Sequence, residues 1–287
     1  MLAAPLFLAF AMLAVPAAAA EPVSVPYAMP ETEMWDMTSA DGQEFRIFVS
    51  RPSAPAPGGG YPILYVLDGN AMFAGFAEAR RIHGFGSSGI DKMIVVGVGH
   101  PGEQIYDARR MFDFTAPIAT PALKQAFAQY QSGGRDRFAK FLLDELRPAI
   151  EKRYSVNTTR QSLYGHSLGG LFALHMLYSR PGAFRTIIAT SPSIWWDNQS
   201  ILAEEAAFRA QVLKTPDTGK ATSLLLMAGE REEEGNIPGD TKALAQRMAA
   251  LSAQGLRSDF IMLDEETHIS VPSRSVTASL RAAARAR

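Results

Sequence analysis

One stretch of this chain combines residues that could carry out nucleophilic catalysis. Residues 162–170 read Ser-Leu-Tyr-Gly-His-Ser-Leu-Gly-Gly, which contains Gly-x-Ser-x-Gly with Ser167 at its centre. A β-prone segment (161–164) precedes the motif and an apolar, helix-prone segment (171–178) follows it. Strand, tight turn and helix together would hold the serine hydroxyl at the tip of a sheet, near the positive end of the helix. The pattern therefore predicts a nucleophile at Ser167, although the same residues also occur in ordinary turns.

A serine hydroxyl is a weak nucleophile at neutral pH, so a base must lie within hydrogen-bonding reach and a third group must orient that base. Of the five histidines, only His268 follows a predicted strand that itself comes after a candidate acid. It lies in the loop beyond the last predicted strand (259–263), which can reach across the sheet to Ser167. We expect His268 to be the base; the alternative is a solvated loop histidine.

The orienting acid should follow the preceding strand, where the segment 229–235 reads Gly-Glu-Arg-Glu-Glu-Glu-Gly. Such a run of glutamates is often only a solvated loop. We choose Glu232, three residues past the first glycine of the segment. The alternatives are Glu230, Glu233 and Glu234.

An oxyanion formed on attack needs two backbone N–H donors. The residue after the nucleophile, Leu168, is expected to supply one, and Asn70, after the predicted strand 61–67, the other. Asp68 at the same strand end is expected to be a helix cap or a loop anchor.

Three further residues are candidates for a substrate pocket. Trp195 and Trp196 follow the predicted strand 185–190 and could form a pocket wall or part of the core. Arg110 lies in a long excursion (101–134) and could bind an anionic substrate or form an ion pair. We expect Asp113 in this excursion to be structural.

Continuous apolar runs and helical stretches alternate along the chain. Such alternation predicts an α/β fold: a mostly parallel central sheet with helices on both faces and an antiparallel N-terminal hairpin, as one domain over residues 21–287. The hairpin is indicated by period-two patterning around Ala40-Asp41-Gly42. The predicted strands cover 31–38, 43–51, 61–67, 92–98, 161–164, 185–190, 222–227 and 259–263, and the main predicted helices 135–153, 201–213, 241–253 and 271–287.

Residues 1–20 are almost wholly apolar and end in four alanines. This segment is typical of a secretory signal peptide cleaved near Ala20, which predicts a periplasmic or secreted protein. It carries no Lys or Arg, and the alternative is an uncleaved N-terminal membrane anchor. No later stretch is long and apolar enough to span a bilayer. The chain has no cysteine, so it contains no disulfide.

Composition argues against several kinds of partner. The formal net charge of the 287 residues is −1, and no dense basic block appears, which argues against nucleic-acid binding. No spacing of His, Cys or acidic residues indicates a metal site, and Gly58-Gly59-Gly60 lacks the following helix of a phosphate loop. We expect no cofactor and a small-molecule ester as the partner; the sequence assigns no oligomeric state.

Several separated motifs together resemble one family. They are residues 61–73 (Tyr-Pro-Ile-Leu-Tyr-Val-Leu-Asp-Gly-Asn-Ala-Met-Phe), 110–117, 165–174 and 191–196 (Ser-Pro-Ser-Ile-Trp-Trp). This set resembles the esterase D-like α/β-hydrolases, and most of all the exported siderophore esterases that linearise catecholate trilactones. The resemblance implies a nucleophile at Ser167, a histidine at His268 and basic pocket residues near Arg110. In the siderophore branch the acid is weakly defined, and a Ser–His dyad can replace the triad.

These observations favour a serine carboxylesterase that acts through an acyl-enzyme. Two alternatives stay open: an acyltransferase of the same fold, and a non-catalytic protein that binds a siderophore or glycan. Labelling by a fluorophosphonate probe separates the third hypothesis from the first two, and product analysis with added alcohols separates the second from the first.

Overall fold

The computed structural model describes residues 24–86 and 89–285, so the predicted signal peptide lies outside the described residues. Residues 24–30 belong to a unit separate from the remainder and contain neither helix nor strand. The large unit begins at Glu31. Within the described ranges, no helix is long and apolar enough to span a bilayer.

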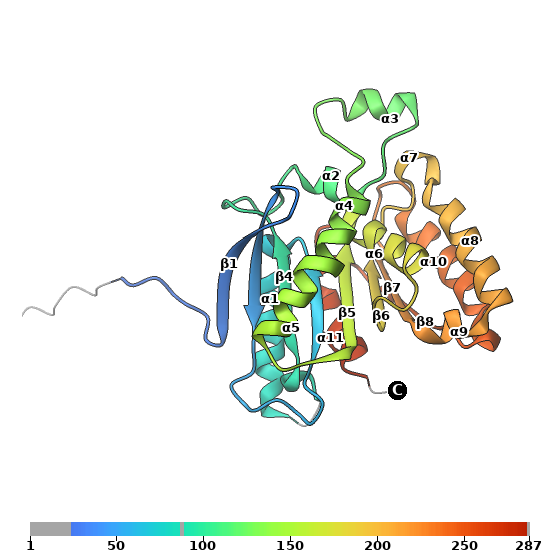
Figure 1. Ribbon diagram of the computed structural model, residues 1–287. Coiled ribbons are helices and arrows are strands. Elements are labelled where there is room, and N and C mark those ends of the chain that lie inside the picture. The colour runs from blue at the N-terminus through green and yellow to red at the C-terminus, as the bar shows by residue number, and fades with distance from the viewer. Residues whose placement is uncertain (1–23, 87–88, 286–287) are drawn as a thin grey trace, which may run out of the picture. The chain divides into compact units, whose positions relative to one another are not determined.

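The large unit is built on an eight-stranded sheet of order β1-β2-β4-β3-β5-β6-β7-β8 (Figure 1). β1 pairs with β2 and β2 with β4 in antiparallel fashion, while all the remaining pairs are parallel. This arrangement confirms the predicted hairpin and the mostly parallel sheet. The strands are β1 (Thr32–Thr38), β2 (Glu44–Ser50), β3 (Tyr61–Leu67), β4 (Ile94–Gly99), β5 (Val156–His166), β6 (Thr186–Thr190), β7 (Ser223–Gly229) and β8 (Arg257–Leu263).

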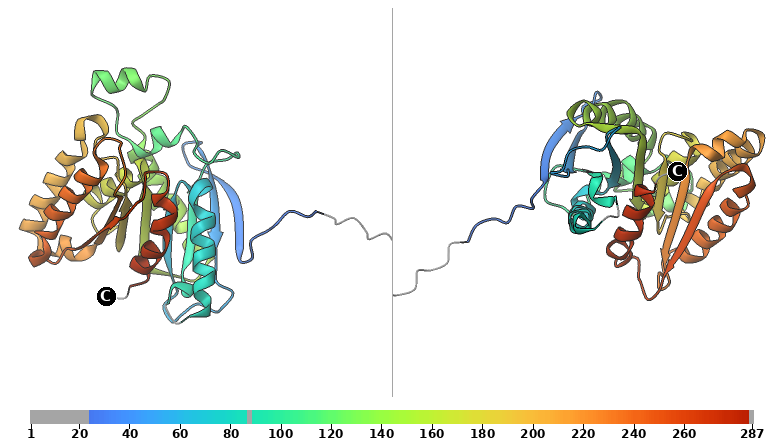
Figure 2. Two further views of the ribbon diagram at one scale, coloured as in Figure 1. Left: turned by 180° about the vertical axis from the view of Figure 1, so that it is seen from behind. Right: turned by 90° about the horizontal axis from the view of Figure 1, so that it is seen from below.

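Helices cover both faces of this sheet (Figure 2). Because a right-handed crossover fixes the face on which each helix lies, the one-way progression from β5 to β8 puts α6, α8 and α10 on the same face. The step from β3 to β4 runs the other way and puts α1 on the opposite face, where it packs against α11. The helices are α1 (Gly69–Ile82), α2 (Arg110–Phe114), α3 (Pro121–Ala126), α4 (Arg135–Lys140), α5 (Arg147–Arg153), α6 (Leu168–Ser179), α7 (Trp196–Gln199), α8 (Ile201–Lys214), α9 (Pro216–Ala221), α10 (Ile237–Ala249) and α11 (Val271–Ala284), with short 3₁₀ turns η1 (His83–Phe85), η2 (Ile90–Lys92) and η4 (Ser252–Gln254) and a π-helical turn η3 (Phe141–Leu146).

The strand order reverses at the centre of the sheet. From β3 the chain moves outward to β4 and then returns past β3 to β5, so the carboxyl ends of β3 and β5 flank a topological switch point. In open α/β sheets, ligands bind in the crevice at such a point. Ser167 follows β5 directly and Asp68 follows β3 directly, so the fold brings these two residues to the crevice. All seven residues of β3 are buried, as the apolar run predicts.

The structure differs from the predicted elements in several places. β5 begins at Val156, five residues before the predicted strand 161–164. The helix expected over 135–153 is present but contains the π-helical turn η3, and Pro148 follows this turn within the same helical run. α10 begins at Ile237, four residues before the predicted start. The excursion contains two short helices, α2 and α3, that the weak periodicity did not indicate.

Candidate active site

The turn between β5 and α6 has the strained geometry that the motif requires. Ser167 has φ 60° and ψ −120°, a conformation that is rare for a residue with a side chain. A Cβ atom at Gly165 would overlap the carbonyl oxygen of Gly169, so only glycine fits at Gly165. The backbone N–H of Ser167 donates to the Thr190 carbonyl at 3.0 Å, which ties the turn to β6. The serine is therefore held rigidly at the tip of the sheet.

Ser167, His268 and Glu232 form one continuous hydrogen-bonded chain. His268 Nε2 lies 3.0 Å from Ser167 Oγ, and His268 Nδ1 lies 2.6 Å from Glu232 Oε2. The Glu232 carboxylate is fully buried, whereas 16% of the His268 side chain is exposed. An imidazole placed between a serine and a carboxylate has the arrangement needed to accept the serine proton.

Glu232 is itself held by two donors that the sequence did not single out. Its Oε1 accepts from Ser191 Oγ at 2.7 Å and from the backbone N–H of Gly229 at 2.5 Å. These two bonds leave Oε2 directed at His268. The other glutamates of the loop, Glu230, Glu233 and Glu234, are exposed and have no contact of this kind with the histidine.

A cavity of about 350 Å³ opens beside Ser167. Trp196 is only 2% exposed yet lines the cavity, so the two interpretations, pocket wall and core, both hold for it. Phe127, from the excursion, packs on Trp196 with ring centroids 5.1 Å apart and extends the aromatic wall. The lining residues are Arg110, Met111, Phe127, Ser167, Leu168, Ser193, Trp195, Trp196, Glu234 and Gly235.

Phe127 reaches this cavity because the part of the excursion just before α3 is fixed. The Asp197 carboxylate accepts from the backbone N–H groups of Ala119 and Thr120 at 3.0 and 2.8 Å. Asp197 has φ 47°, so this anchor stands on a left-handed turn. No periodicity in the excursion indicates that Phe127 lines a pocket. Its aromatic side chain is the only feature of the sequence that could have suggested this role. α3 lies above the carboxyl ends of the strands in Figure 1, and most of its residues are exposed.

Arg110 lies in the cavity wall as half of a buried ion pair. Its Nε and Nη2 donate to the two carboxylate oxygens of Asp68 at 2.8 and 3.0 Å. Burial lowers the pKa of the Arg110 guanidinium, but the charge and hydrogen bonds of Asp68 outweigh this and raise it above its usual value. Asp68 is thus a loop anchor, as expected, and makes no side-chain cap to α1. The pair keeps a cation beside Ser167 at every working pH.

Replacing Asp68 with asparagine is expected to destabilise the protein by about 3 kcal/mol, because it leaves the Arg110 charge buried without a counter-ion. Asparagine tolerates the left-handed backbone that Asp68 adopts, with φ 53°, so the change isolates the charge. Urea unfolding monitored by circular dichroism measures the loss. A matched control is Asp36→Asn, which breaks the exposed ion pair with Arg46 and should cost less than about 1 kcal/mol. Equal losses in the two variants would contradict the expected cost of burial.

The two predicted oxyanion donors differ in their surroundings. Leu168 is the first residue of α6 and lines the cavity, so its backbone N–H has no partner within the helix. The side chain of Asn70 exchanges two hydrogen bonds with the His100 backbone, at 2.9 and 3.0 Å, which ties the loop after β3 to the end of β4. Asn70 is not among the residues that line the cavity. Its role as a donor stays a prediction.

The excursion residue Asp113 is 3% exposed and packs in a separate buried cluster. It accepts from Arg109 Nε at 3.3 Å, and His100 Nε2 lies 2.8 Å away. These contacts join the base of α2 to the end of β4, so the structural interpretation of Asp113 holds. No cluster of His or acidic side chains suited to a metal ion occurs within the described part of the chain.

His166, which precedes the serine, is a second imidazole at the site. Its ring centroid lies 4.6 Å from that of His268, and neither of its nitrogens has a hydrogen-bond partner of ordinary geometry among the described residues. Burial lowers the pKa of the His166 imidazole well below its usual value, and the charges of His268 and Arg110 lower it further. His166 therefore stays neutral and does not compete with His268 for the serine proton.

Mild acid is expected to destabilise the folded protein through His166. Below pH 6.5, an unfolded chain binds a proton at this histidine that the folded state excludes. The free energy of unfolding should then fall by up to about 1.4 kcal/mol per pH unit for this one proton. Urea unfolding at pH 7.5 and pH 5.5 measures the fall, with His166→Phe as a variant that keeps an aromatic ring but cannot titrate. An identical pH dependence in both proteins would show that folded His166 binds the proton.

Comparison with known proteins identifies the family. The Esterase family model matches residues 38–258, more than half of the chain. The chain belongs to this esterase family. The chain is 37% identical over 263 residues to ferri-bacillibactin esterase BesA of Bacillus subtilis, covering 89% of this chain and 90% of the relative. It is also 39% identical over 190 residues to the siderophore triacetylfusarinine C esterase of Aspergillus fumigatus, covering 64% and 63%.

Solved structures agree with this assignment. The crystal structure of BES protein from Bacillus cereus superposes on this chain with a TM-score of 0.83 at 34% identity, covering 92% of this chain and 99% of that one. The siderophore hydrolase EstA from Aspergillus nidulans follows with a TM-score of 0.74 at 26% identity, covering 91% and 97%. The expected resemblance to esterase D-like α/β-hydrolases, close to siderophore esterases, is confirmed.

Proposed function

We propose that this protein hydrolyses carboxylic esters by a serine mechanism with a covalent acyl-enzyme. The observation that supports this proposal best is the unbroken chain from Ser167 Oγ through His268 to the buried carboxylate of Glu232, next to an open cavity. Ser167 is held by its backbone, and Glu232 is held by two hydrogen-bond donors outside the chain of three. Such preorganisation is what a catalytic serine needs.

In the proposed reaction, His268 Nε2 removes the proton from Ser167 Oγ as the oxygen bonds to the ester carbonyl carbon. Glu232 stabilises the imidazolium that results, and the N–H of Leu168, with that of Asn70, holds the oxyanion. The carbon–oxygen bond to the alcohol then breaks, and His268 gives its proton to the departing alkoxide oxygen. Water attacks the acyl-enzyme by the same two steps and releases the carboxylic acid.

We propose siderophore esters as the substrate class. Two relatives support this class: a ferri-bacillibactin esterase and a siderophore triacetylfusarinine C esterase. The cavity combines an aromatic wall, Phe127 with Trp195 and Trp196, and the guanidinium of Arg110. Aromatic rings and a cation together suit a substrate that carries planar, electron-rich or anionic groups.

We further propose that the protein works in an exported compartment, periplasmic or extracellular. The apolar segment 1–20 with its alanine-rich end supports this. Sequencing the amino terminus of protein recovered from the producing cells should find it near Glu21. A retained Met1 would favour the anchor.

The proposal is tested by incubating the purified protein with catecholate trilactones, iron-free and ferric, and with simple p-nitrophenyl esters. Products are identified by mass spectrometry, and a fluorophosphonate probe reports on the nucleophile. We expect linear hydrolysis products and labelling of Ser167. Labelling with transfer of the acyl group to an added alcohol, in place of hydrolysis, would favour an acyltransferase. Ligand binding without labelling would overturn the enzymatic proposal.

A further inference from the structure

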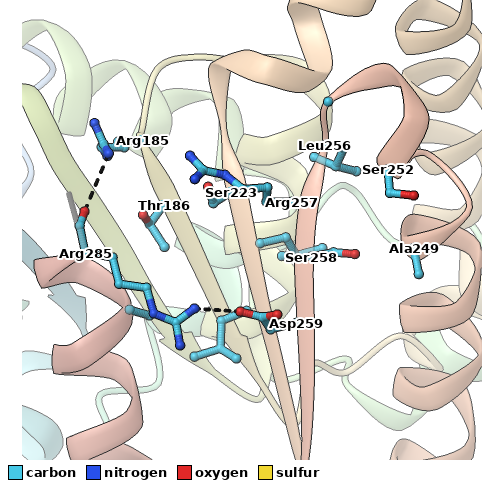
Figure 3. A pocket seen from close by; sticks show the side chains of 14 residues that line it. Arg185, Thr186, Ser223, Ala249, Ser252, Leu256, Arg257, Ser258, Asp259 and Arg285 are labelled. Carbon is cyan, nitrogen blue, oxygen red and sulfur yellow. Dashed lines mark hydrogen bonds and ion pairs between the residues drawn. The ribbon is translucent and has the colours of Figure 1, made fainter. Parts of the chain in front are cut away.

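A second and larger cavity, of about 710 Å³, lies at the opposite end of the sheet (Figure 3). Its floor is formed by the amino ends of β6, β7 and β8, whereas Ser167 follows the carboxyl end of β5. The seven residues of β7 alone separate the two ends of the sheet by about 20 Å at 3.3 Å per residue. This cavity is therefore independent of the candidate active site.

A row of polar side chains crosses the floor of this cavity. Thr186, Ser223 and Arg257 are cross-strand neighbours in the parallel register of β6, β7 and β8. Neighbours in register project from the same face of a sheet, so all three side chains lie on one side. Asp259, two residues past Arg257, shares that side. Elsewhere β6 and β7 carry mainly Ile and Leu, so the polar row interrupts an otherwise apolar surface.

Arginines outnumber carboxylates among the residues that line the cavity. They are Arg185, Arg257 and Arg285, against the single carboxylate of Asp259. Arg285 Nη1 lies 2.7 Å from Asp259 Oδ2, so these two side chains form an ion pair. In Figure 3 the Arg285 guanidinium points to Asp259, while that of Arg257 lies beside Ser223. Within residues 24–86 and 89–285, Arg257 forms no ion pair.

Two hydroxyl groups beside Arg257 also have no partner. Neither Thr186 Oγ1 nor Ser223 Oγ makes a hydrogen bond to another residue in the described part of the chain, although Thr186 is only 6% exposed. Neither hydroxyl is among the fully buried polar atoms of the described residues, so both are open to the cavity and free to bond to a ligand there. One guanidinium and two hydroxyls thus present a convergent set of hydrogen-bond donors to the cavity.

We propose that this cavity binds a small molecule through a phosphate or carboxylate group seated on Arg257, Ser223 and Thr186. A guanidinium donates in parallel to two oxygens of such an anion, and the hydroxyls donate to the remaining lone pairs. A volume of about 710 Å³ exceeds the needs of a bare ion and fits a compound of metabolite size.

Isothermal titration calorimetry with pyrophosphate and with citrate tests the proposal and separates the two kinds of anion. We expect one or both to bind the full-length protein, with Kd at least about tenfold higher in Arg257→Gln, in line with the strength of a charge-assisted hydrogen bond. Ser223→Ala should weaken binding in the same direction. The matched control Arg137→Gln removes an exposed, ion-paired arginine from α4 and should leave Kd unchanged. Binding of pyrophosphate alone assigns the site to phosphates, and binding of citrate alone assigns it to carboxylates.

No binding of either anion, or equal weakening by Arg257→Gln and Arg137→Gln, would overturn the proposal. Thermal unfolding of Arg257→Gln checks that the variant is folded. Because Arg257 lies at the far end of the sheet, this variant should hydrolyse p-nitrophenyl esters at the wild-type rate. Failure of the ester-hydrolase proposal would leave the calorimetric result intact, so the two proposals are tested separately.

Discussion

Ser167→Ala is expected to lower kcat/KM for a p-nitrophenyl ester by about 10⁴-fold or more, to near the level of residual hydrolysis. The reason is that the Ser167 hydroxyl lies 3.0 Å from His268 Nε2, and no other hydroxyl in residues 24–86 and 89–285 is hydrogen-bonded to that nitrogen. Alanine fits the space of serine, so the thermal unfolding midpoint should stay close to the wild-type value. Steady-state kinetics and circular dichroism of the same preparation measure both effects.

Ser193→Ala provides the matched control for this variant. Ser193 Oγ lies 3.3 Å from Ser167 Oγ and lines the same cavity, but it has no contact with His268. We expect it to retain activity within about tenfold of wild type, the loss expected for one neutral hydrogen bond. Retained turnover in Ser167→Ala, or an equally large loss in Ser193→Ala, would move the nucleophile away from Ser167.

The sheet could be predicted from sequence because its strands depend on local patterning. The apolar run of β3 and the period-two alternation of β2 follow directly from burial on both faces and on one face. The turn between β5 and α6 could be predicted as well, because the motif Gly-x-Ser-x-Gly meets the steric requirements of that turn. The π-helical turn η3 could not be predicted from the sequence. The apolar spacing of residues 138–146 fits an ordinary helix, and the extra residue in the π-helical turn depends on packing.

Contacts between distant segments account for the remaining differences. Arg110 and Asp68 are 42 residues apart, and nothing in the sequence around either residue indicates that the two form an ion pair. Ser191 holds Glu232 only because β6 and β7 are neighbours in the sheet. The choice of Glu232 depended on its distance from the end of β7, and the structure brings that residue, with its carboxylate buried, to His268. The position of Phe127 in the cavity depends on how the excursion folds, and no periodicity in its sequence predicts that fold.

Glu232→Gln is expected to lower kcat by about 10³–10⁴-fold with the fold intact. The glutamine oxygen can still accept from Ser191 and Gly229, so its amide NH₂ would face His268 Nδ1. A donor there forces Nδ1 to be the acceptor and places the ring proton on Nε2, which then cannot accept the proton of Ser167. The imidazolium also loses its counter-ion. Steady-state kinetics with p-nitrophenyl esters measure the loss, and urea unfolding checks the fold.

Glu234→Gln is the control that separates this role from the general charge of the loop. Glu234 belongs to the same acidic segment and lines the cavity, but it is exposed and does not contact His268. We expect its kcat to stay near wild type, because an exposed charge contributes less than about 1 kcal/mol. A Glu232→Gln variant with kcat within tenfold of wild type would mean that Ser167 and His268 act as a dyad. In that case the buried carboxylate would serve to join β6, β7 and the histidine loop, and its removal would appear in stability alone.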